Sequence, residues 1–449
     1  MKPDAIREPE QEIPIVDDVD VCVIGGSTTG VFAAVAAARR ACRVALVESL
    51  GFFGGTATAS LVNVWHPRYD TAGAREIIGG LPIETMDRLR RRDAVLDRGN
   101  VSAWQYAFSP AELTCELDAW ICEHPRIRPF LHARFCRALL DGPNRVGAAV
   151  IEDQTGRRAI RARVFVDASG DAVLLHRAGF ETYRRAVIQP PTTCLIAAGL
   201  DGDLDALRRR IFDPATPGAL RPGFLWAAPI PGTALRMIAG TRVHGADVSD
   251  ADDLTRAEIE GRRQARALVD MARGLPGCEN ARLVALPARI GERESRHVRA
   301  RHQLTEAEVL QGVRFDDAIA NGSYPVDVHL GDGDGIVFRY LDGRERVARV
   351  GGPTEERRWA PEGAPRATFY QIPFRSLVPR AGGNVLAAGR CLDADEGAFG
   401  AARVMVNTAQ MGQAAGVAAA LAIRTDADVG RLDAACVRRA LAEQGAVVI

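Results

Sequence analysis

A short run of glycine, serine and threonine near the start of the chain carries the clearest chemistry in the sequence. The segment GGSTTG, residues 25–30, follows the apolar run Val19–Ile24 and precedes the alanine-rich run Val31–Arg40. A second apolar run, Arg43–Val47, ends at Glu48. Strand, turn, helix and strand in this order, with an acid after the second strand, form the context that a dinucleotide-binding fingerprint requires. The segment therefore predicts a site for a pyrophosphate and a ribose. The alternative is a unit of the same shape that binds no nucleotide.

The residue types in this segment suit that chemistry. Gly25 permits a tight turn, and Gly30 permits close packing of helix and strand. Ser27 replaces the middle glycine of the usual pattern but keeps a small side chain. The helix N-terminus offers unpaired N–H groups to a pyrophosphate. We expect Glu48 to accept hydrogen bonds from the ribose hydroxyls.

Two of the eight histidines have neighbours that suit proton transfer. His66 lies in LVNVWHPRYD, and His329 lies in YPVDVHL, where Asp327 could orient its ring. Histidine is the side chain whose ordinary pKa best suits acid–base catalysis near neutral pH. We predict both as catalytic candidates, with a purely structural role as the alternative.

Arginine and tyrosine supply further candidates. The run GERESR contains Arg293 and Arg296, and a run of this kind is by itself typical of a solvated, salt-bridged surface. Tyr370 and Arg375 lie in YQIPFRSLVP, which joins two expected domains and should border their cleft.

The composition excludes several classes of function. Lys+Arg and Asp+Glu are both 57, so the chain has no net charge and no nucleic-acid footprint. Lys2 is the only lysine, which excludes a pyridoxal Schiff base and a P-loop lysine. No apolar stretch is suited to span a membrane.

The cysteines and the first residues indicate the compartment. The nine cysteines are scattered and form no CxxC motif, which argues against a disulfide framework, an iron–sulfur cluster or any metal site. Residues 1–18 are charged and lack the apolar core of a secretory signal. We expect a cytoplasmic protein with a disordered lead over residues 1–18, a small-molecule substrate, and no membrane or nucleic-acid partner. Whether it forms a homo-oligomer is left open.

Four separated segments resemble one family. They are GGSTTG with Glu48, GFFGGTATAS at residues 51–60, FVDASGDA at residues 165–172, and a C-terminal segment that contains NVLAAGRCLDADEGAFGAARVMVNTAQMGQAAG. Together they resemble the FAD-dependent oxidoreductases whose flavin domain is of the glutathione-reductase and fumarate-reductase kind. The resemblance implies noncovalently bound FAD, because no histidine lies within the GG segment where a covalent link would be expected.

The resemblance also implies which residues contact FAD. They comprise the pyrophosphate turn, the GG segment, the strand facing the adenine, the second nucleotide-facing turn, the GR pair and the start of the last long helix: Gly25, Ser27, Thr28, Thr29, Gly30, Glu48, Gly54, Gly55, Thr56, Arg134, Phe135, Ala168, Ser169, Gly170, Asp171, Gly389, Arg390, Arg403, Val404 and Met405. The helix expected from Arg403 to about Ile423 would stabilise negative charge on the flavin. The family also carries a run similar to GERESR, so the resemblance implies that Arg293 and Arg296 face the flavin or an anionic substrate.

The predicted fold class is α/β. A Rossmann-like FAD-binding domain, with a parallel sheet and a three-stranded β-meander, would occupy residues 19–200 and 366–449. An inserted α+β substrate domain would occupy residues 201–365, with strands near 235–243, a helix near 254–273 and a polar, glycine-rich stretch at 331–363. The predicted function is hydride transfer between a small organic substrate and flavin N5. The alternatives are an NAD(P)-dependent dehydrogenase and a non-redox protein that uses FAD as a scaffold.

Overall fold

The computed structural model describes residues 5–6, 8–100, 104–212, 224–330, 335–349 and 352–449. A seven-stranded sheet forms its centre, with β6-β2-β1-β9-β8-β7 in order and β22 also paired with β9. The strands are β1 (Ile15–Ile24), β2 (Val44–Val47), β6 (Ile127–Phe130), β7 (Arg134–Leu140), β8 (Val146–Asp153), β9 (Gly156–Asp167) and β22 (Val385–Ala387).

Two pairing patterns meet in this sheet. Strands β6, β2, β1, β9 and β22 are parallel, while β7, β8 and the first half of β9 form an antiparallel meander. The predicted parallel sheet with a three-stranded meander is thus confirmed. Strand β9 joins the two parts because it is long enough to pair with β8 at one end and with β22 at the other.

Strand β1 is longer than predicted. It begins at Ile15 and not at Val19, because Ile15, Asp17 and Asp18 pair with the early residues of β9. Residues 15–18 therefore belong to the sheet and not to a disordered lead.

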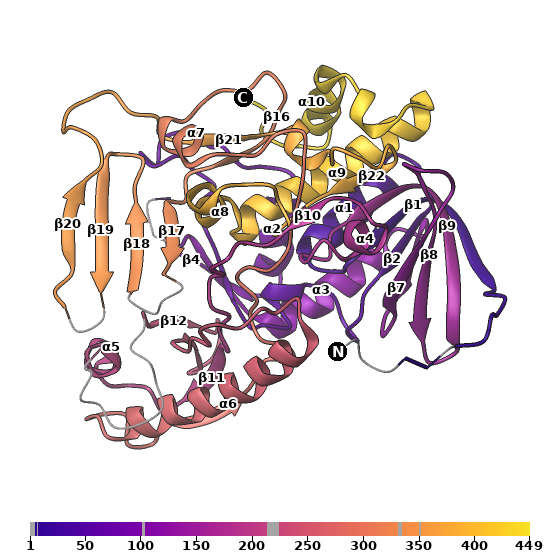
Figure 1. Ribbon diagram of the computed structural model, residues 1–449. Coiled ribbons are helices and arrows are strands. Elements are labelled where there is room, and N and C mark those ends of the chain that lie inside the picture. The colour runs from indigo at the N-terminus through magenta and orange to yellow at the C-terminus, as the bar shows by residue number, and fades with distance from the viewer. Residues whose placement is uncertain (1–4, 7, 101–103, 213–223, 331–334, 350–351) are drawn as a thin grey trace.

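Ten helices have described bounds: α1 (Thr28–Ala38), α2 (Leu81–Arg90), α3 (Pro110–Cys122), α4 (Val173–Arg177), α5 (Leu204–Phe212), α6 (Ala251–Arg273), α7 (Glu306–Gln311), α8 (Glu396–Ala402), α9 (Met405–Thr425) and α10 (Ala434–Glu443). Helices α1 and α9 lie side by side over the central sheet (Figure 1). Every residue of α1 is buried, as its run of alanine and valine without a charge requires. A Cβ on Gly416 of α9 would lie 2.1 Å from the carbonyl oxygen of Ala33, so glycine sets the close approach of the two helices.

Smaller sheets surround the central one. They are β12-β13-β11-β14, β17-β18-β19-β20, β3-β5-β4, and the pairs β16-β21 and β10-β15. Their strands are β3 (Val64–Trp65), β4 (Val95–Asp97), β5 (Tyr106–Phe108), β10 (Thr182–Tyr183), β11 (Leu195–Ala198), β12 (Trp226–Pro229), β13 (Arg236–Ala239), β14 (Arg282–Ala285), β15 (His297–Val298), β16 (Ala318–Gly322), β17 (Val326–His329), β18 (Gly335–Arg339), β19 (Arg344–Arg349), β20 (Glu355–Arg358) and β21 (Tyr370–Pro373). In Figure 1 the β17–β20 sheet stands at the left, in orange, and α6 lies below it.

The expected substrate region agrees with the prediction in part. Helix α6 and strand β13 lie where a helix and a strand were predicted. The stretch 331–363, predicted as polar and glycine-rich, contains strands β18, β19 and β20, and charged side chains mask the strand pattern in β19 and β20. Residues 331–334 and 350–351 lie outside the described residues. Strand β11 belongs to a sheet of the substrate region although it precedes the predicted boundary at residue 201.

No helix in the described part of the chain is both long enough and apolar enough to cross a membrane.

Candidate functional site

The carboxyl ends of four parallel strands meet at one cavity of about 570 Å³. Gly25 follows β1, Glu48 follows β2, Ser169 follows β9 and Gly389 follows β22, and all four residues line the cavity. In open α/β sheets, ligands bind outside the carboxyl ends of the strands. The central sheet therefore positions this cavity where a ligand site is expected.

Two helices present open N-termini to the same cavity. Ser27 precedes α1 and Val404 precedes α9, and neither residue caps its helix with a side-chain hydrogen bond. Neither helix carries an acid in its first turn. Side chains do cap five other helices, α3, α6, α7, α8 and α10, through Ser109, Asp250, Thr305, Asp395 and Asp433. The uncapped N–H groups of α1 and α9 are thus available for anionic groups in the cavity.

The turn before α1 requires glycine. Gly25 has φ +102°, and a Cβ there would lie 2.5 Å from the carbonyl oxygen of Ala168. A Cβ on Gly30 would lie 1.8 Å from the carbonyl oxygen of Gly25. Larger residues at these positions would push the strand ends and α1 apart, so the turn keeps backbone N–H groups at the cavity wall.

Glu48 is held beside this turn. One carboxylate oxygen accepts a hydrogen bond from the backbone N–H of Gly26 at 2.7 Å, and the other accepts one from the N–H of Leu50 at 2.8 Å. Each carboxylate oxygen has more than one lone pair, so Glu48 can still accept hydrogen bonds from a ligand.

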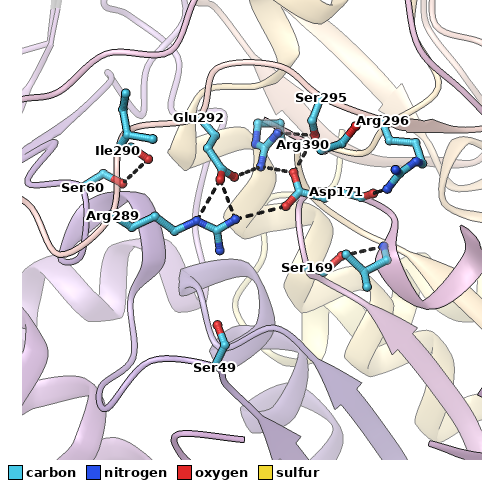
Figure 2. Close-up of polar contacts among 12 residues, drawn as sticks. Ser49, Ser60, Ser169, Asp171, Arg289, Ile290, Glu292, Ser295, Arg296 and Arg390 are labelled. Carbon is cyan, nitrogen blue, oxygen red and sulfur yellow. Dashed lines mark hydrogen bonds and ion pairs between the residues drawn. The ribbon is translucent and has the colours of Figure 1, made fainter. Parts of the chain in front are cut away.

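Four charged residues form a balanced cluster at the cavity: Asp171, Arg289, Glu292 and Arg390 (Figure 2). Arg390 donates to Asp171 at 2.7 Å and to Glu292 at 2.8 Å. Burial favours a higher pKa for Asp171, but Arg390 and Arg289 outweigh it and lower that pKa. Burial makes the largest contribution to raising the pKa of Glu292, and the negative charge of Asp171 adds to it. Two guanidinium groups face two carboxyl groups, so this cluster satisfies its own charges.

A second group of charges is not balanced. This cationic cluster consists of Arg242, Arg293, Arg403 and Asp327, all buried or largely buried. Arg403 donates to Oδ2 of Asp327 at 3.2 Å. Arg293 and Arg242 both donate to the Thr192 hydroxyl, at 2.8 and 3.3 Å, so their guanidinium groups lie close together. Across the described residues, Asp327 is the one carboxylate within ion-pair distance of any of the three arginines.

Burial lowers the pKa of two of these arginines. It lowers the pKa of Arg242 to about 10 and that of Arg293 well below its usual range, and neighbouring guanidinium groups add to both shifts. Arg293 and Arg403 line the cavity, while Arg242 lies behind the wall, where it donates to the carbonyl oxygens of Thr241 and Phe224.

Histidine and tyrosine side chains adjoin the cationic cluster. The rings of His66 and Tyr324 meet edge to face at 4.2 Å, and Tyr324 donates to Asp327 at 2.8 Å. His329 lies with Nε2 3.4 Å from Oδ1 of Asp327. Burial, followed by the charge of Arg403, lowers the pKa of His66 to about 3, and burial with the three arginines lowers the pKa of His329. Both histidines are therefore neutral at physiological pH.

The structure brings most of the predicted site residues together. Those that line the cavity are Gly25, Ser27, Thr28, Thr29, Glu48, Gly55, Thr56, His66, Ala168, Ser169, Gly170, His329, Gly389, Arg390, Arg403, Val404 and Met405. The cavity lining does not include Gly30, Gly54, Arg134, Phe135, Asp171, Arg296, Tyr370 or Arg375. Gly30, Gly54 and Asp171 lie directly behind the wall, next to residues that line it.

Three predicted catalytic residues have other partners. Arg296 donates to the backbone oxygen of Asp171 at 3.2 Å. The Tyr370 hydroxyl is buried and donates to the carbonyl oxygen of Ala401 at 2.9 Å. Arg375 pairs with Asp317 at 2.6 Å. These contacts position chain segments and bring none of the three side chains to the cavity.

The helix expected from Arg403 to about Ile423 is present as α9, but it begins two residues later. Arg403 is the C-cap residue of the short preceding helix α8, and Val404 is the N-cap residue of α9. The Arg403 side chain reaches Asp327 because it leaves the chain between the two helices.

Sequence reasoning did not single out Arg242 or the aromatic wall. The wall consists of Trp104, Phe224, Trp226, Phe338 and Tyr340. These residues come from three distant segments, and no local spacing connects the segments. A weak signal was available for Arg242, which follows the apolar strand β13 as a charged residue in GTRVH.

Comparisons with known proteins agree with this geometry. A family model described as FAD dependent oxidoreductase matches residues 20–441. No curated protein matches the sequence at a significant level.

Similar solved structures are all distant. They include a geranylgeranyl bacteriochlorophyll reductase-like protein from Thermoplasma acidophilum, with 12% identity, TM-score 0.47, and 95% of this chain and 83% of that chain covered. A p-nitrophenol 4-monooxygenase from Pseudomonas putida has 12% identity and TM-score 0.48, with 95% and 86% covered. PqsL from P. aeruginosa, solved with 2-aminobenzoylacetate, has 14% identity and TM-score 0.43, with 95% and 92% covered.

Proposed function

The chain belongs to the family of FAD-dependent oxidoreductases, and from this we propose that it transfers a hydride between a small organic substrate and N5 of the flavin. FAD is the cofactor, and the protein is an enzyme.

The residues at the cavity fit FAD. The uncapped N-terminus of α1 suits the pyrophosphate, and Glu48 lies where it can accept from ribose hydroxyls. The uncapped N-terminus of α9 opens on the same cavity, next to Gly389 and Arg390. When bound, FAD supplies N5 as the hydride acceptor or donor and gains negative charge at N1 and C2=O on reduction. The N–H groups at Val404 and Met405 would stabilise that charge.

One observation carries the proposal. A single cavity is lined by the nucleotide turn at one part of its wall and by His66, Tyr324 and His329 at another. Hydride transfer needs a substrate against the flavin and a group that moves the accompanying proton. His66 lines the cavity, and its buried Nδ1 atom has no hydrogen-bond partner among the described residues, so we assign the proton transfer to this imidazole.

The test is anaerobic reduction of the purified holoenzyme with a panel of small alcohols, amines and hydroxy acids. We expect loss of the oxidised flavin absorbance with at least one of them, and a primary deuterium isotope effect when the donated hydrogen is labelled. The His66→Ala variant should retain FAD and slow this reduction by about 10² to 10⁴-fold, the usual contribution of a positioned acid or base. Turnover of a substrate with the flavin oxidised throughout would support the scaffold alternative instead.

A further inference from the structure

The cationic cluster carries an excess of two positive charges, which no carboxylate among the described residues compensates. Arg242, Arg293 and Arg403 face one carboxylate, Asp327. The balanced cluster at the same cavity shows the contrast, because its two arginines are matched by two carboxyl groups. Burying a charge without a partner costs free energy, so a buried excess of positive charge next to a ligand cavity indicates that an anion completes the site.

The hydrogen-bond partners separate the roles of the three arginines. Arg242 donates to two backbone carbonyls, to Thr192 and to His329 at 3.3 Å, so its nitrogens are occupied and it contributes charge from behind the wall. Arg293 lines the cavity and donates through Nη1 alone, to Thr192 and to the carbonyl oxygen of Pro190. Its other guanidinium nitrogens have no hydrogen bond to any described residue.

Arg403 is also incompletely paired. Its Nη2 atom donates to Asp327, while its buried Nε atom has no partner among the described residues. Arg293 and Arg403 both line the cavity, and each contributes to lowering the pKa of His329. A guanidinium fork is the group that best matches the planar geometry of a carboxylate.

Part of the cavity wall is aromatic. The Phe224 and Phe338 rings meet edge to face at 6.0 Å, and Phe338 stacks with Tyr340 at 6.3 Å. Trp104 and Trp226 complete this wall. Such a surface favours a flat, apolar body over a sugar or a polyol.

We propose that the substrate of this enzyme is a carboxylic acid with an aromatic or similarly flat apolar body, whose carboxylate binds Arg293 and Arg403. The proposal rests on the proposed function, since it names the substrate class of the same cavity. The bound carboxylate also places a negative charge near His66 and so offsets the effect of Arg403 on that ring. A substrate of this class would therefore make His66 a better proton acceptor.

Binding to the oxidised holoenzyme tests the proposal without turnover. Benzoate and its uncharged analogue benzamide are the probes, and perturbation of the flavin absorbance, checked by calorimetry, gives each dissociation constant. We expect saturable benzoate binding that is at least about tenfold tighter than benzamide binding, because a hydrogen bond to a charged group contributes more than one between neutral groups. Equal affinities, or no saturable benzoate signal, would overturn the proposal.

Variants of the two arginines test whether these residues bind the carboxylate. Arg293→Gln should weaken benzoate binding about tenfold or more while leaving benzamide binding within about twofold. Arg293→Lys should recover part of the loss because it restores the charge without the fork. Arg314→Gln is the matched control: Arg314 also lacks a carboxylate partner and stacks on Phe369, but it lies outside the cavity, so benzoate affinity should not change.

If Arg293→Gln fails to retain FAD, Arg403→Gln gives the same comparison of benzoate with benzamide. Equal losses for the two probes in whichever variant holds FAD would overturn the assignment. Failure of the two proposals is distinguishable: benzoate binding without any reduction by substrates contradicts hydride transfer alone, and reduction by uncharged substrates without benzoate binding contradicts the carboxylate site alone.

Discussion

Asp327 links the three kinds of side chain in the site. Its Oδ2 atom accepts hydrogen bonds from Tyr324 and Arg403, and its Oδ1 atom lies 3.4 Å from His329. Asp327 belongs to β17, and Gly400 of α8 packs closely on the Asp327 backbone. A Cβ on Gly400 would lie 2.6 Å from the backbone carbonyl oxygen of Asp327. The carboxylate is therefore fixed by backbone packing as well as by its own hydrogen bonds.

Replacing Asp327 should destabilise the protein strongly. Asp327→Asn keeps the shape of the side chain but leaves three buried arginines with no carboxylate among the described residues. We expect a loss of about 3 kcal/mol in the free energy of unfolding of the holoenzyme, as for other broken buried ion pairs. Urea unfolding measures it. Asp317→Asn is the control, because its partner Arg375 is partly exposed, and it should cost about 1 kcal/mol or less. Equal losses in the two variants would contradict the buried-charge argument.

His66 should make the folded protein less stable at acid pH. Burial and Arg403 lower its folded pKa to about 3, whereas an unfolded histidine has a pKa of about 6.5. Between these values the unfolded chain binds a proton that the folded protein does not, so stability falls as the pH falls from about 6.5 towards 3, by up to about 1.4 kcal/mol per pH unit. His66→Gln should make the fall between pH 7 and pH 5 smaller by about 2 kcal/mol, measured by urea unfolding. Identical pH dependence in variant and parent would show that His66 is not buried as described.

At the scale of elements, the nucleotide turn could be predicted because its causes are local. Gly30 is required by its contact with Gly25 within one continuous strand–turn–helix unit, and Gly25 is required there by its φ of +102°; the contact of Gly25 with Ala168 comes from a distant segment. The cationic cluster could not be predicted, because Arg242, Arg293 and Arg403 come from segments that no local pattern relates. Arg293 and Arg403 were expected near a ligand, but their shared excess of charge became visible only once Asp327 was placed between them.

The contact between α1 and α9 explains why the last long helix is rich in small residues. Gly416→Val should hold the two helices apart, since even a Cβ would lie 2.1 Å from Ala33. We expect loss of FAD from the purified variant and a lower melting temperature, because both helix N-termini at the cavity would shift. Flavin absorbance per mole of protein and thermal unfolding measure the two effects. Gly352→Ala, at an open position, should leave both unchanged. Full flavin content in Gly416→Val would contradict this account.

At the scale of the whole molecule, the residues that we propose for cofactor and for substrate line one cavity, to which three sheets contribute. The central sheet contributes its carboxyl edge, the β11–β14 sheet contributes Trp226 and Ala239, and the β17–β20 sheet contributes Phe338 and His329. In Figure 1 the central sheet is at the right, the β17–β20 sheet is at the left, and β11 and β12 lie below, although the strands are far apart in sequence. The division into a flavin domain and a substrate domain at residues 201 and 365 stays a prediction.

Bound cofactor should hold these parts together. Purified protein is expected to be yellow and to release FAD, not FMN or NAD, when it is denatured by heat. Adding FAD at about a hundred times its dissociation constant to protein stripped of flavin should stabilise the folded state by about 2.7 kcal/mol, visible as a higher melting temperature. Chromatography and mass spectrometry identify the released compound. A colourless protein that binds NAD and ignores FAD would contradict the assignment of the cofactor residues.

The burial of α1 by α9 has a consequence for synthesis of the chain. The apolar helix α1 leaves the ribosome long before α9, which covers it. At about 5 to 20 residues per second, the interval between the two helices is on the order of half a minute. During that time a helix with no polar face is exposed to other nascent chains. Chains that terminate before α8 should therefore accumulate as aggregates or bound to chaperones, because synthesis of α9 is the event that buries α1.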